Sequence, residues 1–488
     1  MPLLLVPRVA LLAGPVALAF FAGGYADRPR LVALGVAGLT LALAALLAPR
    51  PLLPASRASR LALGAFLALV VWVALSTRWA PLDDAAADDA ERWALYGVAM
   101  LAGVLCWRSR AAARLVEPAV AAGITLVTGY GLAGRLIPAL VPQTPSVTAA
   151  GRFEQPLTYW NASGMLAALG LVLCARIAGD RERPGWLRCC AVAAGVALGT
   201  AVVLSFSRGA LAALAGGLLV LLVVAPTWSQ LRGLAIVLET AALGLVAPVL
   251  SDAVRTLTGS AATRQHDGAL VALAMLVVAA IGVGLMLWNL RNERDSRLRE
   301  GRIALPRWAG GAAAAVVALL VLLPVLARDE GAPTSVNPVT GATTARLTSL
   351  GSSRYDYWRV ARDAWLEQPV AGLGTGGYAV AWLAARPKPE RVRDVHSLPL
   401  EVLTELGLIG ALLLLATGTG VVLAARRVLT EDPALAAGPV AGLVVYAVHA
   451  SIDWDWELPA TGLVAITLVA MLLAQAPAER RPQPGATA

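Results

Sequence analysis

The sequence is poor in charge and has almost no lysine, histidine or cysteine. Charged residues make up 15% of its 488 residues and apolar residues make up 58%, whereas soluble domains contain about 25% charged residues. This balance excludes a disordered chain and a coiled coil. Four cysteines in a chain of this length exclude a secreted disulfide scaffold. The composition therefore indicates a membrane protein.

Long apolar runs fill most of the chain, and a membrane-spanning helix needs about 20 mostly apolar residues. The sequence predicts an all-α polytopic membrane protein with about 14 (12–14) transmembrane helices. The predicted spans lie near residues 8–24, 31–48, 61–77, 94–107, 115–140, 158–178, 189–206, 209–226, 233–250, 268–290, 308–327, 398–424, 436–450 and 460–476.

Four segments follow from these spans. Residues 1–327 hold about 11 transmembrane helices, residues 328–397 form a long outer (periplasmic-side) loop, residues 398–476 hold about three more helices, and residues 477–488 form a cytoplasmic tail. No internal repeat is visible.

The position of the charges explains the formal net charge of +9, which in a soluble protein would favour nucleic-acid binding. Cytoplasmic loops of membrane proteins carry an excess of arginine and lysine. With both termini in the cytoplasm, 22 basic and 10 acidic residues lie inside, and 18 basic and 21 acidic residues lie outside. The charge therefore predicts orientation and no nucleic-acid partner. All four cysteines then fall at cytoplasmic ends of spans.

The outer loop 328–397 contains one predicted helix, SSRYDYWRVARDAWLEQP. Ser353 is a candidate N-cap with Asp356 as its capping-box partner, and Gln368-Pro369 ends the helix. Its amphipathic face suits a helix lying at the outer membrane surface. The following GLGTGG (372–377) is interpreted as a flexible turn and not as a dinucleotide loop, because no strand precedes it.

Two arginines at the outer boundary are candidates for binding an anion. Arg208 interrupts two apolar runs in a short turn that carries no acidic residue, and a cation at a helix start opposes the helix dipole. A snorkelling loop arginine is the alternative interpretation. Arg152 and Asn161, in GRFEQPLTYWNASG, indicate a head-group site, although an interfacial belt of aromatic residues explains the same segment equally well.

A histidine at the end of the outer loop is the candidate acid–base group. His396 is one of three histidines, with Glu401 and Glu405 one and two turns further on, and a histidine at the water–membrane boundary exchanges protons near neutral pH. A simple structural hydrogen bond is the alternative role. The outer loop also holds Arg354 and Arg362, and the closing turn holds Asp453, which is expected either to pair with an outer arginine or to belong to the aromatic belt. The histidines and cysteines show no metal-ligand spacing.

These motifs together resemble the O-antigen ligase and O-antigen polymerase superfamily of bacterial membrane glycosyltransferases. The resemblance covers roughly residues 150–460, and its most specific part is the element from His396 to Gly410, in which Ser397 stands where members commonly have asparagine. The other motifs are RFEQPLTYWNASG (152–164), Ser207-Arg208-Gly209, Arg354 to Trp365, Pro369 to Gly374 and HASIDWDW (449–456).

The resemblance implies a fold similar to the multi-span, lipid-dependent glycosyltransferases. It implies transfer of a glycan from a polyprenyl (undecaprenyl) diphosphate-linked donor to an acceptor hydroxyl at the outer face of the bacterial cytoplasmic (inner) membrane, inverting and without a cofactor or metal. Arg208 and Arg354 would hold the diphosphate, and His396 would act as the acceptor base or position the acceptor. The expected substrate-binding residues are Arg152, Asn161, Arg362, Glu405 and Asp453.

The expected partners are the lipid-linked donor, membrane lipids, and an acceptor that is a lipid, a protein or another glycan chain, as in lipopolysaccharide and polysaccharide biosynthesis. Ligases and polymerases share these motifs, so both remain open. A cell-wall polymerase, a flippase or other transporter, and a membrane anchor are further alternatives; a transporter is disfavoured because polar residues gather at the outer boundary and not at the midplane.

Overall fold

The computed structural model describes residues 2–295, 301–326, 342 and 353–479, and within these ranges all regular elements are helices. The first half contains α1 (Leu5–Ala19), α2 (Asp27–Leu47), α3 (Arg57–Ser76), α4 (Asp83–Cys106), α5 (Arg110–Leu136), α6 (Trp160–Gly179), α7 (Gly185–Leu204), α8 (Arg208–Val224), α9 (Trp228–Gly244), α10 (Val246–Leu250) and α11 (Asp252–Arg255). The second half contains α12 (Ala261–Arg294), α13 (Ala309–Leu326), α15 (Arg354–Glu367), α16 (Tyr378–Ala385), α17 (Leu398–Glu431), α18 (Pro433–Ala450) and α19 (Pro459–Gln475). Three short 3₁₀ turns complete the list: η1 (Pro2–Leu4), η2 (Ala22–Gly24) and η3 (Asp455–Glu457).

Each of the fourteen predicted spans coincides with a helix, which confirms an all-helical polytopic fold. Nine of the described helical segments are long and apolar enough to cross a membrane: α2, α3, α5, α6, α7, α9 together with α10, α12, α17 and α18. The shorter apolar helices are α1, α8, α13 and α19, and α4 carries acidic residues throughout its first half. The number of spans therefore remains a prediction.

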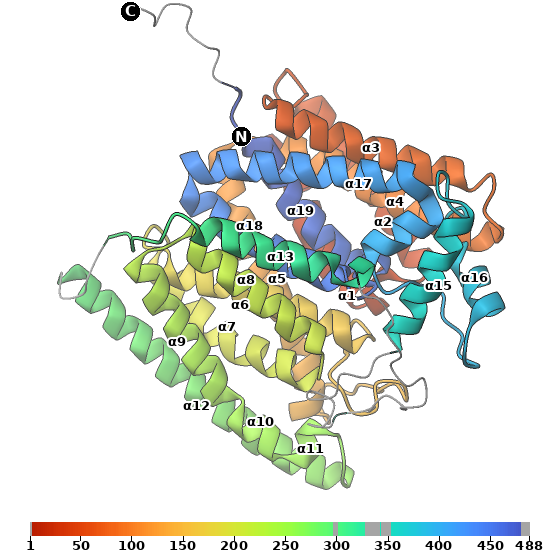
Figure 1. The fold of residues 1–488 in the computed structure, drawn as a ribbon. Coiled ribbons are helices and arrows are strands. Elements are labelled where there is room, and N and C mark those ends of the chain that lie inside the picture. The colour runs from red at the N-terminus through yellow and green to blue at the C-terminus, as the bar shows by residue number, and fades with distance from the viewer. Residues whose placement is uncertain (1, 296–300, 327–341, 343–352, 480–488) are drawn as a thin grey trace, which may run out of the picture.

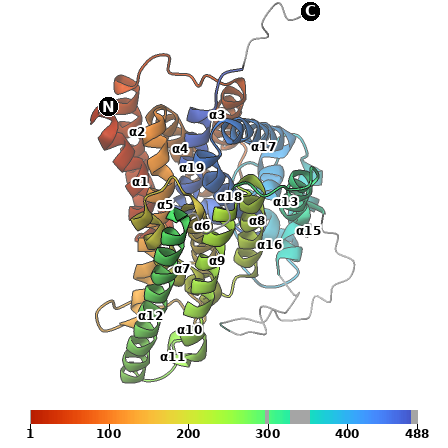
Figure 2. The same ribbon diagram turned by 90° about the vertical axis from the view of Figure 1, so that its left-hand side faces the viewer.

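The bundle is organised around α6. Every residue from Asn161 to Gly179 is buried, because α5, α7, α8, α9 and α18 all pack on this helix. Glycines allow the closest approaches: a Cβ at Gly217 of α8 would overlap Val445 of α18. Figure 1 shows α12 along one edge of the bundle and α15 with α16 at the opposite edge, and Figure 2 shows the same arrangement from the side.

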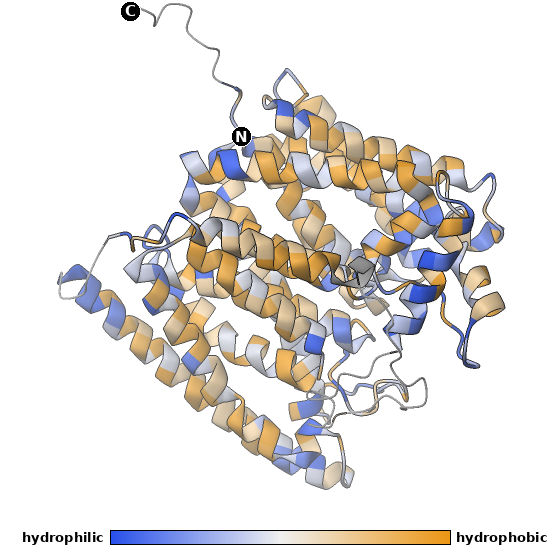
Figure 3. Ribbon diagram, viewed as in Figure 1, coloured by the Kyte–Doolittle hydropathy of each residue, from blue (hydrophilic) through white to orange (hydrophobic). Residues whose placement is uncertain are grey.

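Apolar side chains cover the outside of the bundle as well as its core. On α12 the exposed large side chains include Leu270, Leu273, Leu276, Ile281 and Trp288. Figure 3 shows hydrophobic residues along the lengths of the helices and hydrophilic residues gathered at helix ends and on α15. Exposed apolar surface of this extent is expected on helices that face lipid.

The charged residues gather at two opposite ends of the bundle. At one end, Arg188 of α7 forms a buried ion pair with Glu293 of α12, whose carboxylate lies 2.8 Å away. Arg183 pairs with Glu117 there. At the other end, six chain segments meet. They lie around residues 25–30, 78–92, 152–160, 205–208, 354–397 and 453–457. If successive spans cross the membrane in alternating directions, all six segments are expected on the same side. Clustering at both ends supports a chain that crosses the membrane repeatedly.

The helix α17 bends at Gly407, which has φ 65° and ψ −164°. The residues Pro369 and Val370 dock on the bend, since the Leu408 amide donates to the Pro369 carbonyl at 2.9 Å. The Leu406 carbonyl accepts from Trp72 Nε1 at 3.0 Å. The bend aims the first turns of α17, with Glu401 and Glu405, toward the outer-loop residues.

The predicted amphipathic helix is present as α15, but its predicted cap is wrong. Ser353 has helical backbone angles and makes no side-chain capping hydrogen bond. The buried face, which includes Trp358, Ala361 and Ala364, packs on α16 and α17. This contact with protein, and not a cap, stabilises the start of the helix.

Candidate active site

A buried polar cluster forms where α15 meets the turn between α18 and α19. Arg354, the first residue of α15, donates from Nη2 to Asp453 Oδ2 at 2.5 Å, and Asp453 is fully buried. The other carboxylate oxygen of Asp453 accepts from the Tyr159 hydroxyl at 2.6 Å, which in turn accepts from Asn161 Nδ2 at 2.8 Å. Burial alone would raise the pKa of Asp453, but the charge of Arg354 holds it below its ordinary value. The pairing of Asp453 with an outer arginine is thus present in the structure.

His396 lies beside this cluster, in the segment that leads into α17. Its Nδ1 is 2.9 Å from the Asp394 carbonyl, and a carbonyl only accepts, so Nδ1 carries the proton and Nε2 is the acceptor. Burial lowers the pKa of His396 below its ordinary 6.5. The backbone is left-handed at this residue, with φ 58°, which costs about 1–3 kcal/mol and is typical of functional positions. The ring is therefore held as a neutral base.

Glu401 fixes the backbone next to His396. Its carboxylate accepts from the Val395 amide at 3.0 Å and from Trp456 Nε1 at 3.0 Å. The same side chain thereby ties the histidine segment to the turn that carries Asp453. The Trp454 ring lies 6.2 Å from the His396 ring, centre to centre.

Arg208 begins α8, where Ser207 caps the helix by accepting from the Ala210 amide. Its positive charge lies close enough to that of Arg354 for the two to repel each other. The structure thus brings Arg208, Arg354 and His396 to one place, from three distant parts of the sequence.

A second buried histidine joins the site, and the sequence reasoning did not select it. His449 Nδ1 is 2.5 Å from Asp455 Oδ2, and both residues are fully buried. The ring reaches the start of α8, because a Cβ at Gly209 would lie 3.2 Å from His449 Nε2. The glycine of the SRG motif therefore allows α8 to approach the ring. The motif HASIDWDW (449–456), which begins with His449, was a signal for this residue.

Three of the predicted binding residues have local partners. Arg152 is buried, bonds the Ala149 and Thr148 carbonyls at 2.7 Å and stacks on Trp160 with 3.5 Å between Cζ and the ring centre. Asn161 bonds Tyr159 inside the cluster described above. Arg362 is exposed on α15 and bonds the Asp363 side chain. Asn161 thus belongs to the cluster of Tyr159, Arg354 and Asp453.

The glycine-rich segment 372–377 is a fixed turn, so the prediction of a flexible one is wrong. Its amides bond the framework: Gly374 N to the Glu405 carbonyl at 2.9 Å, and Gly376 N to the Glu405 carboxylate at 2.9 Å. The Gly374 backbone has φ 84°, and a Cβ there would lie 2.6 Å from Ala80 Cα. Glu405 also accepts from the Tyr378 amide at 3.0 Å, so this carboxylate organises the turn.

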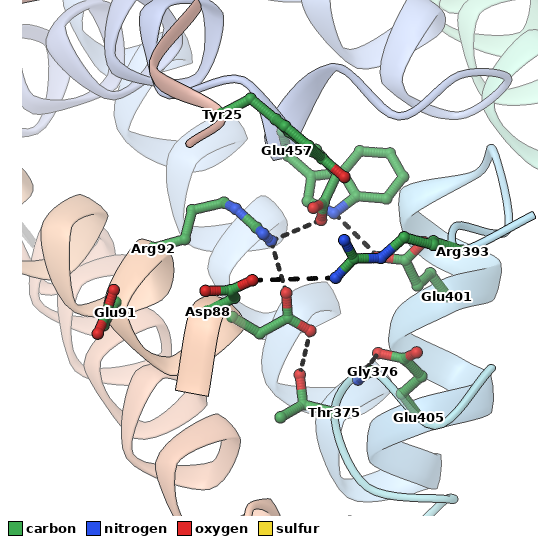
Figure 4. A network of polar contacts seen from close by, with 12 residues as sticks. Tyr25, Asp88, Glu91, Arg92, Thr375, Gly376, Arg393, Glu401, Glu405 and Glu457 are labelled. Atoms are coloured by element: carbon green, nitrogen blue, oxygen red, sulfur yellow. Dashed lines mark hydrogen bonds and ion pairs between the residues drawn. The ribbon is translucent and has the colours of Figure 1, made fainter. Parts of the chain in front are cut away.

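An acidic cavity of about 730 Å³ adjoins the site. Arg92 lies in its wall and donates to Asp89 at 2.8 Å and to Glu457 at 2.6 Å. Figure 4 shows its contact with Glu457. The Asp89 carboxylate also accepts from Thr375 Oγ1 at 2.6 Å. Burial raises the pKa of Asp394, another residue of the wall, to about 6. Among the described residues, no group of three or more histidines, cysteines and carboxylates is arranged to hold a metal ion.

Comparison with known proteins identifies part of this framework. Residues 268–415, which include α15, the fixed turn and His396, match the family model of the O-antigen ligase domain. No curated protein matches the chain. The matched range contains Arg354 and His396, and the match supports the resemblance of the chain to the O-antigen ligase superfamily.

Proposed function

We propose that the protein transfers a glycan from a polyprenyl diphosphate-linked donor to a hydroxyl of an acceptor. The observation that carries the proposal is the neutral His396 ring, oriented by the Asp394 carbonyl next to the Arg354–Asp453 pair. A histidine ring that is neutral at the working pH is available to accept a proton, and general-base catalysis of this kind accelerates a transfer typically by 10²–10⁴-fold.

The arginines suit the leaving group. The bond from the anomeric carbon to the phosphate oxygen breaks, and the diphosphate takes the electron pair. Arg208 and Arg354 place two guanidinium groups near each other, and a bound diphosphate would offset their mutual repulsion. Asp453 and Tyr159 hold Arg354 in one orientation, so that the charge needs little reorganisation during the reaction.

The acceptor oxygen forms the new bond to the anomeric carbon. Its proton passes to His396 Nε2, and the polyprenyl diphosphate departs from the opposite side, which inverts the anomeric configuration. Asp453 stabilises the resulting imidazolium electrostatically, because its negative charge favours the protonated ring.

The site is proposed to face the outside of the cytoplasmic membrane, with both termini in the cytoplasm. The support is the excess of arginines at the opposite end of the bundle, where Arg110, Arg114, Arg183 and Arg188 lie. Labelling of a single cysteine introduced at exposed Arg78, in intact cells, tests this orientation.

The decisive experiment uses the full-length protein in lipid nanodiscs with an undecaprenyl diphosphate-linked oligosaccharide and a glycan acceptor. Wild-type protein should release undecaprenyl diphosphate and form a longer glycan. Arg208→Ala and His396→Ala should each abolish release, whereas the matched outer-side variants Arg78→Ala and His266→Ala should retain it, because both side chains are exposed. Normal transfer by Arg208→Ala and His396→Ala, or movement of intact donor across a vesicle without release, would overturn the proposal.

A further inference from the structure

The acidic cavity is built by chain segments that lie far apart in the sequence. Its wall contains residues of the η2–α2 corner, the start of α4, the fixed glycine-rich turn, the start of α17 and η3. Nine carboxylates and three guanidinium groups line a volume of about 730 Å³. Small-molecule sites in proteins occupy about 300–1,000 Å³, so the cavity is large enough for a ligand of that kind.

The wall is graded from an exposed mouth to a buried floor. Asp83 and Asp84 are exposed at the mouth, whereas Arg92 and Glu457 are buried. Arg92 is 3% exposed, and its Nε donor has no hydrogen-bond partner among the described residues. Arg30 is equally buried and holds Asp88 at 2.5 Å. The arginines therefore fix the carboxylates in place.

The excess of carboxylates determines what the cavity can accept. An anionic ligand would be repelled by the negative wall, so the diphosphate of the donor belongs with Arg208 and Arg354 and not here. Carboxylates accept hydrogen bonds from hydroxyl and ammonium groups. The wall is thus complementary to a ligand rich in such donors.

The cavity is connected to His396 through shared residues. Asp394 lines the cavity with its side chain, while its carbonyl orients the His396 ring. Tyr25 of the wall packs on Trp454 with 5.7 Å between ring centres, and Trp454 lies 6.2 Å from His396. Figure 4 shows the Arg393 guanidinium facing the Asp88 carboxylate, with Tyr25 beside Glu457. A ligand in the cavity would therefore lie next to the base.

We propose that this cavity binds the acceptor saccharide, and that the acceptor sugar is neutral or carries amino groups and has no phosphate or carboxylate in the part that enters. The proposal rests on the glycosyl transfer described above and adds the chemical class of the acceptor. Sugar hydroxyls donate to the wall carboxylates, and the apolar face of the ring packs against Tyr25.

Saturation-transfer NMR on the full-length protein in phosphatidylcholine nanodiscs tests the proposal without any donor present. The probes are maltotriose, a glucosamine trimer and a galacturonate trimer, each measured with and without EDTA. Maltotriose and the glucosamine trimer should bind, and the galacturonate trimer should bind at least about tenfold more weakly. Sugar binding that disappears in EDTA would show that the carboxylates hold a cation, and equal binding of all three probes would show that the wall does not select; either result overturns the proposal.

Two variants locate the binding. Asp394→Asn should weaken maltotriose binding about tenfold, because a charged acceptor is lost, and Asp84→Lys, at the exposed mouth, should raise galacturonate binding several-fold. Asp267→Asn, a carboxylate of the outer end of α12 away from the cavity, is the control and should change neither. Unchanged sugar binding in both cavity variants would contradict the assignment. If Asp394→Asn folds poorly, Asp84→Lys still tests it, because Asp84 is exposed and its replacement should leave the fold intact.

A separate measurement keeps the two proposals distinguishable. Binding of phosphorus-32-labelled undecaprenyl diphosphate to wild-type and Arg354→Ala protein reports on the donor site alone. Equal donor binding by both proteins counts against the proposed function, whereas absent sugar binding with normal donor binding counts against the acceptor cavity alone.

Discussion

Replacing Glu401 by glutamine should slow the reaction without weakening donor binding. The Glu401 carboxylate contacts neither His396 nor Arg354 in the described structure; it accepts one hydrogen bond from the Val395 amide and one from Trp456 Nε1, each at 3.0 Å. A glutamine offers one oxygen and one NH₂ group, so one of the two donors would face another donor.

The magnitude follows from that mismatch. Leaving one buried donor without an acceptor costs about 1–3 kcal/mol, and the segment 394–396 can relieve this only by moving. A shift of about 1 Å in a catalytic group lowers a rate by up to about 10²-fold. We therefore expect kcat to fall roughly 5- to 150-fold, because each 1.4 kcal/mol corresponds to a factor of ten. The KM for the lipid-linked donor should stay within about twofold.

Steady-state release of polyprenyl diphosphate by protein in nanodiscs measures both constants. Trp456→Phe is the companion variant, since it removes one of the two donors and leaves the carboxylate with Val395 alone. Combining it with Glu401→Gln removes the donor–donor conflict if the glutamine oxygen turns to Val395, so the double variant should be faster than Glu401→Gln alone. Unchanged kcat in Glu401→Gln, or a rise in donor KM with constant kcat, would refute a positioning role for Glu401.

Three further outcomes are expected. Because burial lowers the pKa of His396 and only the neutral ring can accept a proton, kcat/KM should stay level as the pH falls to 6.5 and decline below it; a pH–rate profile with its acidic midpoint above 6.5 would argue against this base. Arg354→Lys keeps the charge but loses the forked geometry toward Asp453, so binding of labelled undecaprenyl diphosphate should weaken about tenfold or more, and equal affinity would be inconsistent with that geometry. Gly407→Ala places a Cβ against the Val370 carbonyl at φ 65° and should lower stability by about 1–3 kcal/mol, read as a lower Tm, while Gly418→Ala in open space on the same helix should not; equal Tm values for the two variants would exclude strain at the bend.

The fold was largely predictable because apolar runs of sufficient length are local features. All fourteen predicted spans coincide with helices, and α15 begins one residue after the expected cap. The prediction of a Ser353 cap was wrong, because a capping box describes only local hydrogen bonds. The packing of Trp358 and Ala361 on α17 decides where α15 begins.

The sequence indicated several residues of the candidate site, but it did not predict which of them contact one another. Arg208, Arg354, His396 and Asp453 stand out by residue type, yet their convergence depends on helix packing across the whole bundle. The contacts of the turn at residues 372–377 were not predicted. Its rigidity comes from the distant carboxylate of Glu405 and from Ala80, which pattern reading does not bring together.

Little in the sequence indicated the acidic cavity. Asp83, Asp84, Asp88 and Asp89 form an acidic run in the sequence, and a run of this kind does not by itself indicate a cavity. In the structure Asp89 bonds Arg92 and Thr375, and Arg92 reaches Glu457. Local sequence patterns do not predict this cavity, because residues on its opposite sides are several hundred positions apart in the chain.

The contact between Arg92 and Glu457 joins positions 365 apart in the chain, and Arg354 pairs with Asp453 from the turn before α19. During synthesis the N-terminal helices emerge first, so Arg92 of α4 can meet Glu457 only after the turn that carries η3 has been made. Assembly of the Arg354–Asp453 pair therefore requires the turn between α18 and α19. A nascent chain that has completed only residues 268–415 would still lack the carboxylate that holds Arg354.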